Sequence, residues 1–70
     1  MLTELRVPVP NRPGVLAQIA LGLCEADINI VDMALSPSLD GQQGVVALWV
    51  SEGSAPEASE CLDKLGLPVL

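Results

Sequence analysis

The sequence predicts a small α+β domain in which two helices cover one face of a four-stranded antiparallel sheet. Three observations support this fold class. Segments with the period of a strand and segments with the period of a helix follow one another in the order β-α-β-β-α-β. The 70 residues suffice for one domain, 1–70, and 50% of them are hydrophobic, as in a globular chain. An Asp40-Gly41 pair between two apolar runs is typical of a hairpin turn.

The first strand is predicted near the N-terminus, where Leu5, Val7 and Val9 alternate with polar residues and prolines. This alternation indicates a strand with one buried face. Because Pro8 cannot donate a hydrogen bond to a neighbouring strand, we expect the pairing of this strand to weaken after Val7.

A helical period replaces the alternation from Pro13 to about Ala26. We expect Asn11 to cap this helix and Pro13 to occupy its first turn, and we expect the helix to end near Asp27. Gly22 lies inside the helix, where glycine costs about 1 kcal/mol relative to alanine, so its presence indicates close packing against another element. The predicted buried stripe consists of Leu16, Ile19, Ala20 and Leu23.

The middle of the chain predicts two further strands, Ile28–Leu35 and Gly44–Val50, separated by turn-forming residues. The second of these strands is apolar throughout, so both of its faces need to be covered. The first has two expected faces, with Ile28, Ile30 and Ala34 on one and Val31, Met33 and Leu35 on the other.

A second helix and a short last strand complete the predicted fold. Ser54 and Glu57 have the spacing of a capping box, and Gly66 is a suitable stop for the helix. Residues Leu67–Leu70 leave room for a fourth strand. The resulting order is that of split βαβ, or ferredoxin-like, domains. The predicted buried stripe of the second helix is Ala58, Cys61, Leu62 and Leu65.

The composition excludes several classes of function. The net charge is −6, and only Arg6, Arg12 and Lys64 are basic, which argues against binding to nucleic acid or to an anionic membrane surface. The chain has no histidine, the commonest general base and metal ligand, so we expect no catalytic residues, no metal and no cofactor. No apolar run approaches the length of a membrane span.

Cys24 and Cys61 lie far apart in the sequence, each on an apolar face of a predicted helix. A metal site needs closely spaced ligands such as C-x-x-C, and none occur. We therefore interpret both as buried free thiols in a reducing cytoplasm, where we expect the protein to be located.

The two helices cover a single face of the predicted sheet, although its second and third strands are apolar on both sides. Small domains often complete their core by association. We therefore predict a homodimer or a docked partner, with contacts at Leu21, Val31, Met33 and Leu35. The alternative is that these are ordinary exposed aliphatic residues.

The segment Val9–Leu16 (VPNRPGVL) is the candidate functional site, because it lies where the first strand ends and the first helix begins. Gly14 removes side-chain bulk in front of backbone N–H groups that have no partner within the helix. Such a corner can hold an anion.

This segment and the segment Ala26–Ile30 (ADINI) resemble the ACT domain family, in which [D/N]-R-P-G-x-L is followed about a dozen residues later by G/A-x-[I/V]-N-I. The resemblance covers nearly the whole chain. It implies a non-catalytic regulatory domain that binds a free amino acid at a dimer interface and controls an attached enzyme. The segment Val7–Gly14, the strand that begins at Gly44 and the ending Gly66-Leu67-Pro68 look most like the C-terminal ACT domain of bacterial prephenate dehydrogenases. This resemblance implies a parent enzyme of the tyrosine pathway and a domain cut from it.

The resemblance places the ligand between Asn11 of one subunit and Asn29 of the other, because Asn11 matches a ligand-contacting position of serine-regulated phosphoglycerate dehydrogenases. Val9 falls where those enzymes have a ligand-contacting histidine, which puts serine in doubt as the ligand. Independently, the first helix is about 20 Å long, so Asn11 and Asn29 cannot share a small ligand within one chain. A two-fold axis with antiparallel helices brings them together. The predicted ligand-binding residues are Asn11, Arg12, Pro13, Gly14, Val15, Leu16, Asn29 and Ile30.

In this hypothesis the N–H groups of Gly14 and Val15 hold the ligand carboxylate, and the side chains of Asn11 and Asn29 accept from its ammonium. Three alternatives stay open. Asn11 can be an ordinary helix cap, with Arg12 solvated beside acidic neighbours. The domain can be a dimerisation module without a ligand. A small enzyme on the same topology is the weakest alternative, because no nucleophile and base pair can be named.

Overall fold

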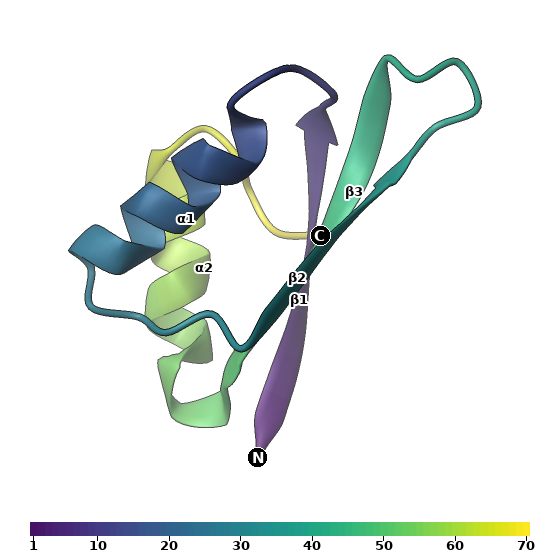
Figure 1. Cartoon of the computed structure of the whole chain (residues 1–70). Coiled ribbons are helices and arrows are strands. Elements are labelled where there is room, and N and C mark those ends of the chain that lie inside the picture. Colours follow the sequence, from purple (N-terminus) through teal and green to yellow (C-terminus); the bar gives the residue numbers. More distant parts are fainter.

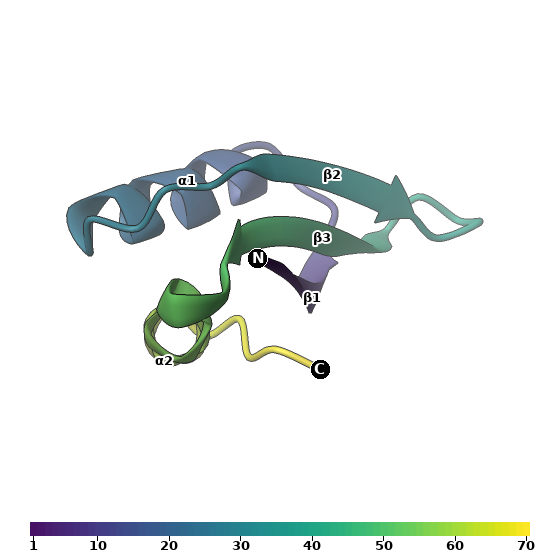
Figure 2. The ribbon, with the colours of Figure 1, turned by 90° about the horizontal axis from the view of Figure 1, so that it is seen from below.

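The computed structural model describes residues 1–70 and contains one antiparallel sheet and two helices on one of its faces (Figures 1 and 2). The strand order is β1-β3-β2, which places β3 in the centre. The predicted α+β class and the order β-α-β-β-α are confirmed. The elements are β1 (Leu2–Pro10), α1 (Val15–Glu25), β2 (Asp32–Pro37), β3 (Gln43–Ser51), the short 3-10 helix η1 (Glu52–Ser54) and α2 (Ala55–Lys64).

The core lies between the sheet and the helices and contains no buried polar side chain. The alternation of β1 and β3 is preserved in their register, since Leu5 pairs with Leu48 and Val7 pairs with Val46. These residues face the helices together. The core consists of Leu5, Val7, Val9, Val15, Ile19, Leu23, Ile28, Val46, Leu48, Val50, Ala58, Leu62 and Leu67.

The predicted fourth strand does not form, and the sheet has three strands. Leu67–Leu70 runs along the outer edge of β1 but makes one backbone bond to it, from the Leu70 N–H to the Arg6 carbonyl, 2.8 Å. Every second residue of a strand faces the same edge, so Pro8 and Pro10 face outward with Arg6. Because Pro8, Pro10 and Pro68 have no N–H, a regular ladder cannot extend along this edge.

The same geometry explains why the expected weakening of β1 after Val7 is wrong. The pairing with β3 continues through Pro8 opposite Val45 and Pro10 opposite Gln43. The proline nitrogens face away from β3, so no bond of that ladder is lost. The prolines affect the outer edge of β1 and leave its inner edge intact.

The predicted boundaries of α1 and β2 also need correction. α1 begins at Val15 rather than Pro13, and β2 begins at Asp32 rather than Ile28. The Ile28 N–H bonds to the Leu23 carbonyl at 2.9 Å, which closes α1 in a Schellman motif. Because the backbone of Ile28 belongs to this turn, Ile28 cannot begin the strand.

α2 ends as predicted beside Gly66, whose φ is +79°. Its start differs from the prediction, because Ser54 occupies the cap position without a side-chain hydrogen bond, so no capping box forms. Pro56 in the first turn supplies the fixed φ that favours a helix start.

Two glycines lie close to other side chains, which confirms the prediction for Gly22. A Cβ on Gly22 would lie 2.6 Å from Cδ1 of Leu65, and one on Gly44 would lie 2.7 Å from Cδ1 of Leu35 and 2.9 Å from the Ser36 carbonyl oxygen. Leu65 can change rotamer, whereas the backbone of β2 is held in the sheet. The two positions therefore differ in what alanine would cost.

We predict that Gly44→Ala destabilises the domain by about 1–3 kcal/mol, the usual range for overpacking. Gly22→Ala is the matched control: the gain in helix propensity, about 1 kcal/mol, offsets the movement of Leu65. Urea denaturation of both variants measures the two free energies of unfolding. Equal losses at both positions would contradict this explanation.

Candidate functional site

The start of α1 is built on Gly14, which occupies the cap position with φ +87°. No side chain caps the helix, so the prediction that Asn11 is the cap is wrong. The Val15 N–H bonds to the Arg12 carbonyl at 3.3 Å, and the Gln18 N–H bonds to the Gly14 carbonyl at 2.8 Å. The next two N–H groups of the first turn, those of Leu16 and Ala17, have no partner within the chain.

Asn11 instead connects β1 to the loop between β2 and β3. Its backbone N–H bonds to the Gln42 carbonyl at 3.0 Å, and its Nδ2 donates to the Gly41 carbonyl at 2.8 Å. Both bonds use nitrogen donors and leave the side-chain oxygen Oδ1 available as an acceptor.

Arg12 has an amide neighbour rather than the acidic neighbours that we expected. Its Nη2 donates to Oε1 of Gln18 at 3.0 Å, and Gln18 in turn donates to the Leu65 carbonyl at 3.4 Å. The side chain is exposed, so its positive charge remains near the start of α1.

A shallow hollow of about 470 Å³ lies at the start of α1, and we call it the N-terminal hollow. It brings together six of the eight predicted site residues. Its free backbone N–H groups and one guanidinium favour an anion, while most of its side chains are apolar. It is lined by Asn11, Arg12, Pro13, Gly14, Val15, Leu16, Ala17 and Leu35.

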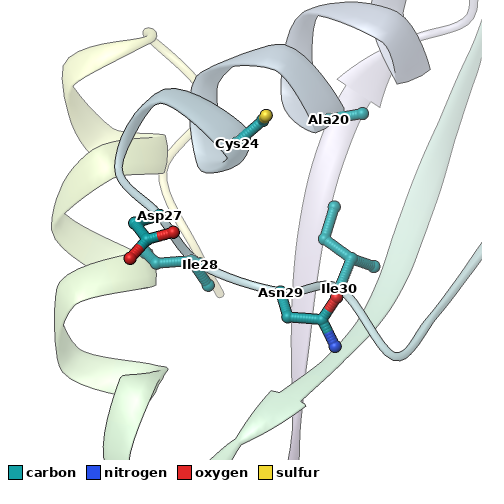
Figure 3. Close-up of a pocket in the computed structure, with 6 residues that line it drawn as sticks. All are labelled: Ala20, Cys24, Asp27, Ile28, Asn29 and Ile30. Carbon is teal, nitrogen blue, oxygen red and sulfur yellow. The ribbon is translucent and has the colours of Figure 1, made fainter.

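The other two predicted site residues, Asn29 and Ile30, line a separate hollow of about 350 Å³ below the end of α1 (Figure 3). We call this the C-terminal hollow. As the length of the helix predicted, no pocket joins Asn11 to Asn29 within one chain. The C-terminal hollow is lined by Ala20, Cys24, Asp27, Ile28, Asn29 and Ile30.

The sequence prediction did not select Asp27, the one non-glycine residue with positive φ, +60°. A signal was present, because the helical period ends there without the glycine that usually follows a helix. The prediction that Cys24 is buried is wrong, because its thiol is exposed, and Cys61 is half-buried with its Sγ 3.4 Å from the Gly22 carbonyl oxygen.

The outer face of α1 between the two hollows is apolar and exposed. Ala17, Leu21 and Cys24 lie on it at helical spacing, and Leu21 is 60% exposed. Val31, 49% exposed, lies just before β2. A helix that is apolar on its outer side is usually covered by a partner. Of the other predicted contact residues, Met33 and Leu35 are half-buried and pack on the core instead.

The loop after β2 supports Asn11 and has an electrostatic feature of its own. The Ser38 hydroxyl and the Gln42 backbone N–H both donate to Oδ1 of Asp40. These bonds favour the charged carboxylate and hold the pKa of Asp40 below its ordinary value.

We predict that Ser38→Ala raises the pKa of Asp40 toward its ordinary value, because the hydroxyl is the larger cause of the shift. A carboxyl whose pKa is lower in the folded than in the unfolded state stabilises the fold at pH values above its unfolded pKa. This contribution is lost as the pH falls through the folded pKa. NMR titration of the Asp40 side chain measures the shift, and amide signals of Asn11 and Gly41 should move with it below about pH 4. An unchanged pKa in the variant would contradict this assignment.

No three His, Cys, Asp or Glu side chains are grouped so that they could hold a metal ion. Neither helix is long and apolar enough to span a bilayer.

Solved structures of other proteins share this fold. The regulatory subunit of aspartate kinase from Thermus flavus matches over 100% of the chain with a TM-score of 0.80 and 22% identity, and 52% of that subunit is covered. The corresponding subunit from Thermus thermophilus, in its ligand-free form, matches over 99% with a TM-score of 0.78 and 21% identity, and 50% of it is covered. Protein BT0572 from Bacteroides thetaiotaomicron matches over 96% with a TM-score of 0.79 and 19% identity, and 44% of it is covered.

The chain thus spans about half the length of these solved structures and shares their fold. No family model matches the sequence, and no curated protein matches it.

Proposed function

We propose that this chain is a non-catalytic regulatory domain that binds a free amino acid between two copies of itself. The observation that carries the proposal is the placement of two incomplete hollows at opposite ends of α1, with an exposed apolar face between them. An antiparallel pairing of two α1 helices covers that face. It also sets the N-terminal hollow of each copy against the C-terminal hollow of the other, which gives two equivalent sites.

The free N–H groups of Leu16 and Ala17 and the Arg12 guanidinium bind the ligand carboxylate in this proposal. This differs from the sequence hypothesis, because the Val15 N–H already has a partner in the Arg12 carbonyl. Oδ1 of Asn11 and the side chain of the partner subunit's Asn29 accept from the ammonium. Apolar lining from Leu16 and Leu35 favours an apolar ligand side chain.

The attached enzyme is proposed to be an amino-acid biosynthetic enzyme that is controlled by feedback. The solved structures with this fold include regulatory subunits of aspartate kinase, while the sequence resembles the C-terminal domain of prephenate dehydrogenase. Both resemblances agree on a regulatory role and differ in the enzyme. We favour prephenate dehydrogenase and therefore tyrosine, because an apolar hollow suits an aromatic ring better than a charged side chain.

A dimerisation module without a ligand is the second candidate, and one observation favours it. Val9 stands where the serine-regulated phosphoglycerate dehydrogenases, which this segment resembles, have a ligand-contacting histidine. Here the side chain of Val9 is only 4% exposed and lies inside the core. One polar partner of the ligand is therefore missing.

Titration of the chain with the twenty amino acids, followed by thermal shift and amide NMR, separates the two candidates. We expect an amino acid with an apolar side chain to shift the amides of Leu16, Ala17 and Asn29. Ligand at 100 times its dissociation constant adds about 2.7 kcal/mol of stability.

Asn11→Ala and Asn29→Ala should each abolish this binding and leave the dimer intact in sedimentation. Gln42→Ala, an exposed amide with no side-chain role in the hollows, is the control. A wild-type dimer that no amino acid perturbs would establish the dimerisation module.

A further inference from the structure

The two helices of the domain end in the same motif, and the comparison between them singles out Asp27. After α2, the N–H groups of Gly66 and Leu67 bond to the carbonyls of Asp63 and Leu62. After α1, the N–H groups of Asp27 and Ile28 bond to the carbonyls of Cys24 and Leu23 in the same pattern. This Schellman motif needs a left-handed residue, for which glycine is the residue without strain. α2 uses Gly66, whereas α1 uses Asp27 at φ +60°.

A carboxylate is unfavourable at this place for a second reason. The C-terminal end of a helix carries partial negative charge, and the last turn of α1 contains no basic residue to balance it. The Asp27 carboxylate also forms no ion pair and accepts no side-chain or backbone hydrogen bond within the chain. No group of a single copy pairs with this exposed charge, which solvent alone hydrates.

The carboxylate instead stands at the rim of the C-terminal hollow, two residues from the exposed Asn29 (Figure 3). The other polar side chains that line this hollow are those of Asn29 and Cys24, with Ala20, Ile28 and Ile30 forming the apolar remainder. The hollow is therefore suited to a cation with one charge, such as a primary ammonium.

We propose that Asp27 of one copy binds the ammonium of the amino acid whose carboxylate is held at the N-terminal hollow of the other copy. This inference rests on the function proposed above and assigns its specificity. In the antiparallel pair, the positive end of one α1 lies beside the negative end of the other, where Asp27 adds a full charge. The site therefore has a positive side and a negative side, which match the carboxylate and the ammonium of a zwitterionic ligand. The site selects an α-amino acid over the carboxylic acid that has the same side chain and no amine.

Isothermal titration of the wild-type chain and of Asp27→Asn tests this with two pairs of probes. The amino acids are L-tyrosine, the proposed ligand, and L-leucine, and their counterparts without the amine are 3-(4-hydroxyphenyl)propionate and 4-methylpentanoate. Asparagine has nearly the same shape, tolerates the left-handed conformation and removes only the charge. We expect the wild type to bind each amino acid at least tenfold more tightly than its counterpart, and Asp27→Asn to lose most of that preference, with unchanged or tighter binding of the acids.

Two further variants isolate the cause. Asp27→Gly removes the carboxylate and relieves the backbone, so it should lose the same preference while its melting temperature rises. Glu52→Gln removes an exposed negative charge in η1, outside the hollow, and should bind as the wild type does.

Equal preferences in the wild type and Asp27→Asn would overturn the assignment of Asp27 and leave the proposed function standing. Failure of the wild type to bind any of the four probes would overturn this assignment together with the apolar-ligand site on which it rests. The titration therefore distinguishes the two failures.

Discussion

Leu48→Ala is expected to leave little folded protein. Leu48 is 0% exposed on the central strand and pairs with Leu5 on one side and Met33 on the other. Truncation of a fully buried leucine costs about 2–5 kcal/mol through lost transfer energy and the cavity left behind. A domain of this size has a total stability of only about 3–5 kcal/mol from a single core, so the variant loses most of it. Urea denaturation followed by circular dichroism measures the loss.

Val45→Ala is the matched control, because Val45 lies on the same strand but faces the side of the sheet without helices, where it is half-buried. We expect it to cost less than about 1 kcal/mol, since little buried surface and no enclosed cavity are involved. Similar losses from both substitutions would show that the helix-free face is as well packed as the core.

Leu21→Glu is expected to convert the dimer into folded monomers and to abolish amino-acid binding together with it. Leu21 is 60% exposed on the outer face of α1, so its side chain contributes little to the fold of one copy. In the proposed dimer it lies between the two hollows, where an unpaired carboxylate would be buried. Burial of this unpaired charge costs several kcal/mol of binding free energy, which a small interface does not offset. We therefore expect dimerisation to weaken by about 100-fold or more. Sedimentation velocity measures the change.

Leu39→Glu makes the same chemical change on another surface. Leu39 is fully exposed in the loop between β2 and β3, outside both hollows. This variant should remain dimeric and bind as the wild type does. Dissociation by Leu39→Glu with no effect of Leu21→Glu would place the interface on the loop instead.

The fold class follows from periodicity alone, because periodicity records burial directly. The alternation of Leu5, Val7 and Val9 and the helical spacing of Ile19 and Leu23 match the core that the structure shows. The tight packing at Gly22 was equally predictable, since an interior helical glycine needs a reason. These inferences depend on contacts that repeat along a segment, which a sequence displays.

Two of the features that the sequence misassigned depend instead on contacts between distant segments. Asn11 is of a residue type that often caps helices, but its side chain donates a hydrogen bond to the carbonyl of Gly41, thirty residues away. The same holds for the last residues of the chain. Their pairing with β1 depends on which edge Pro8 and Pro10 face, and a strand's alternation does not reveal this.

The sequence by itself thus determined the order β-α-β-β-α, most of the core and the two segments that form the candidate site. Only the tertiary structure decided how these segments are used. It joined Asn11 to the loop between β2 and β3, left the N–H groups of Leu16 and Ala17 free, and exposed Asp27 in a left-handed conformation. The physical reason is that local patterns record which side chains are buried. Partners of polar groups are chosen by three-dimensional proximity, which no local pattern contains.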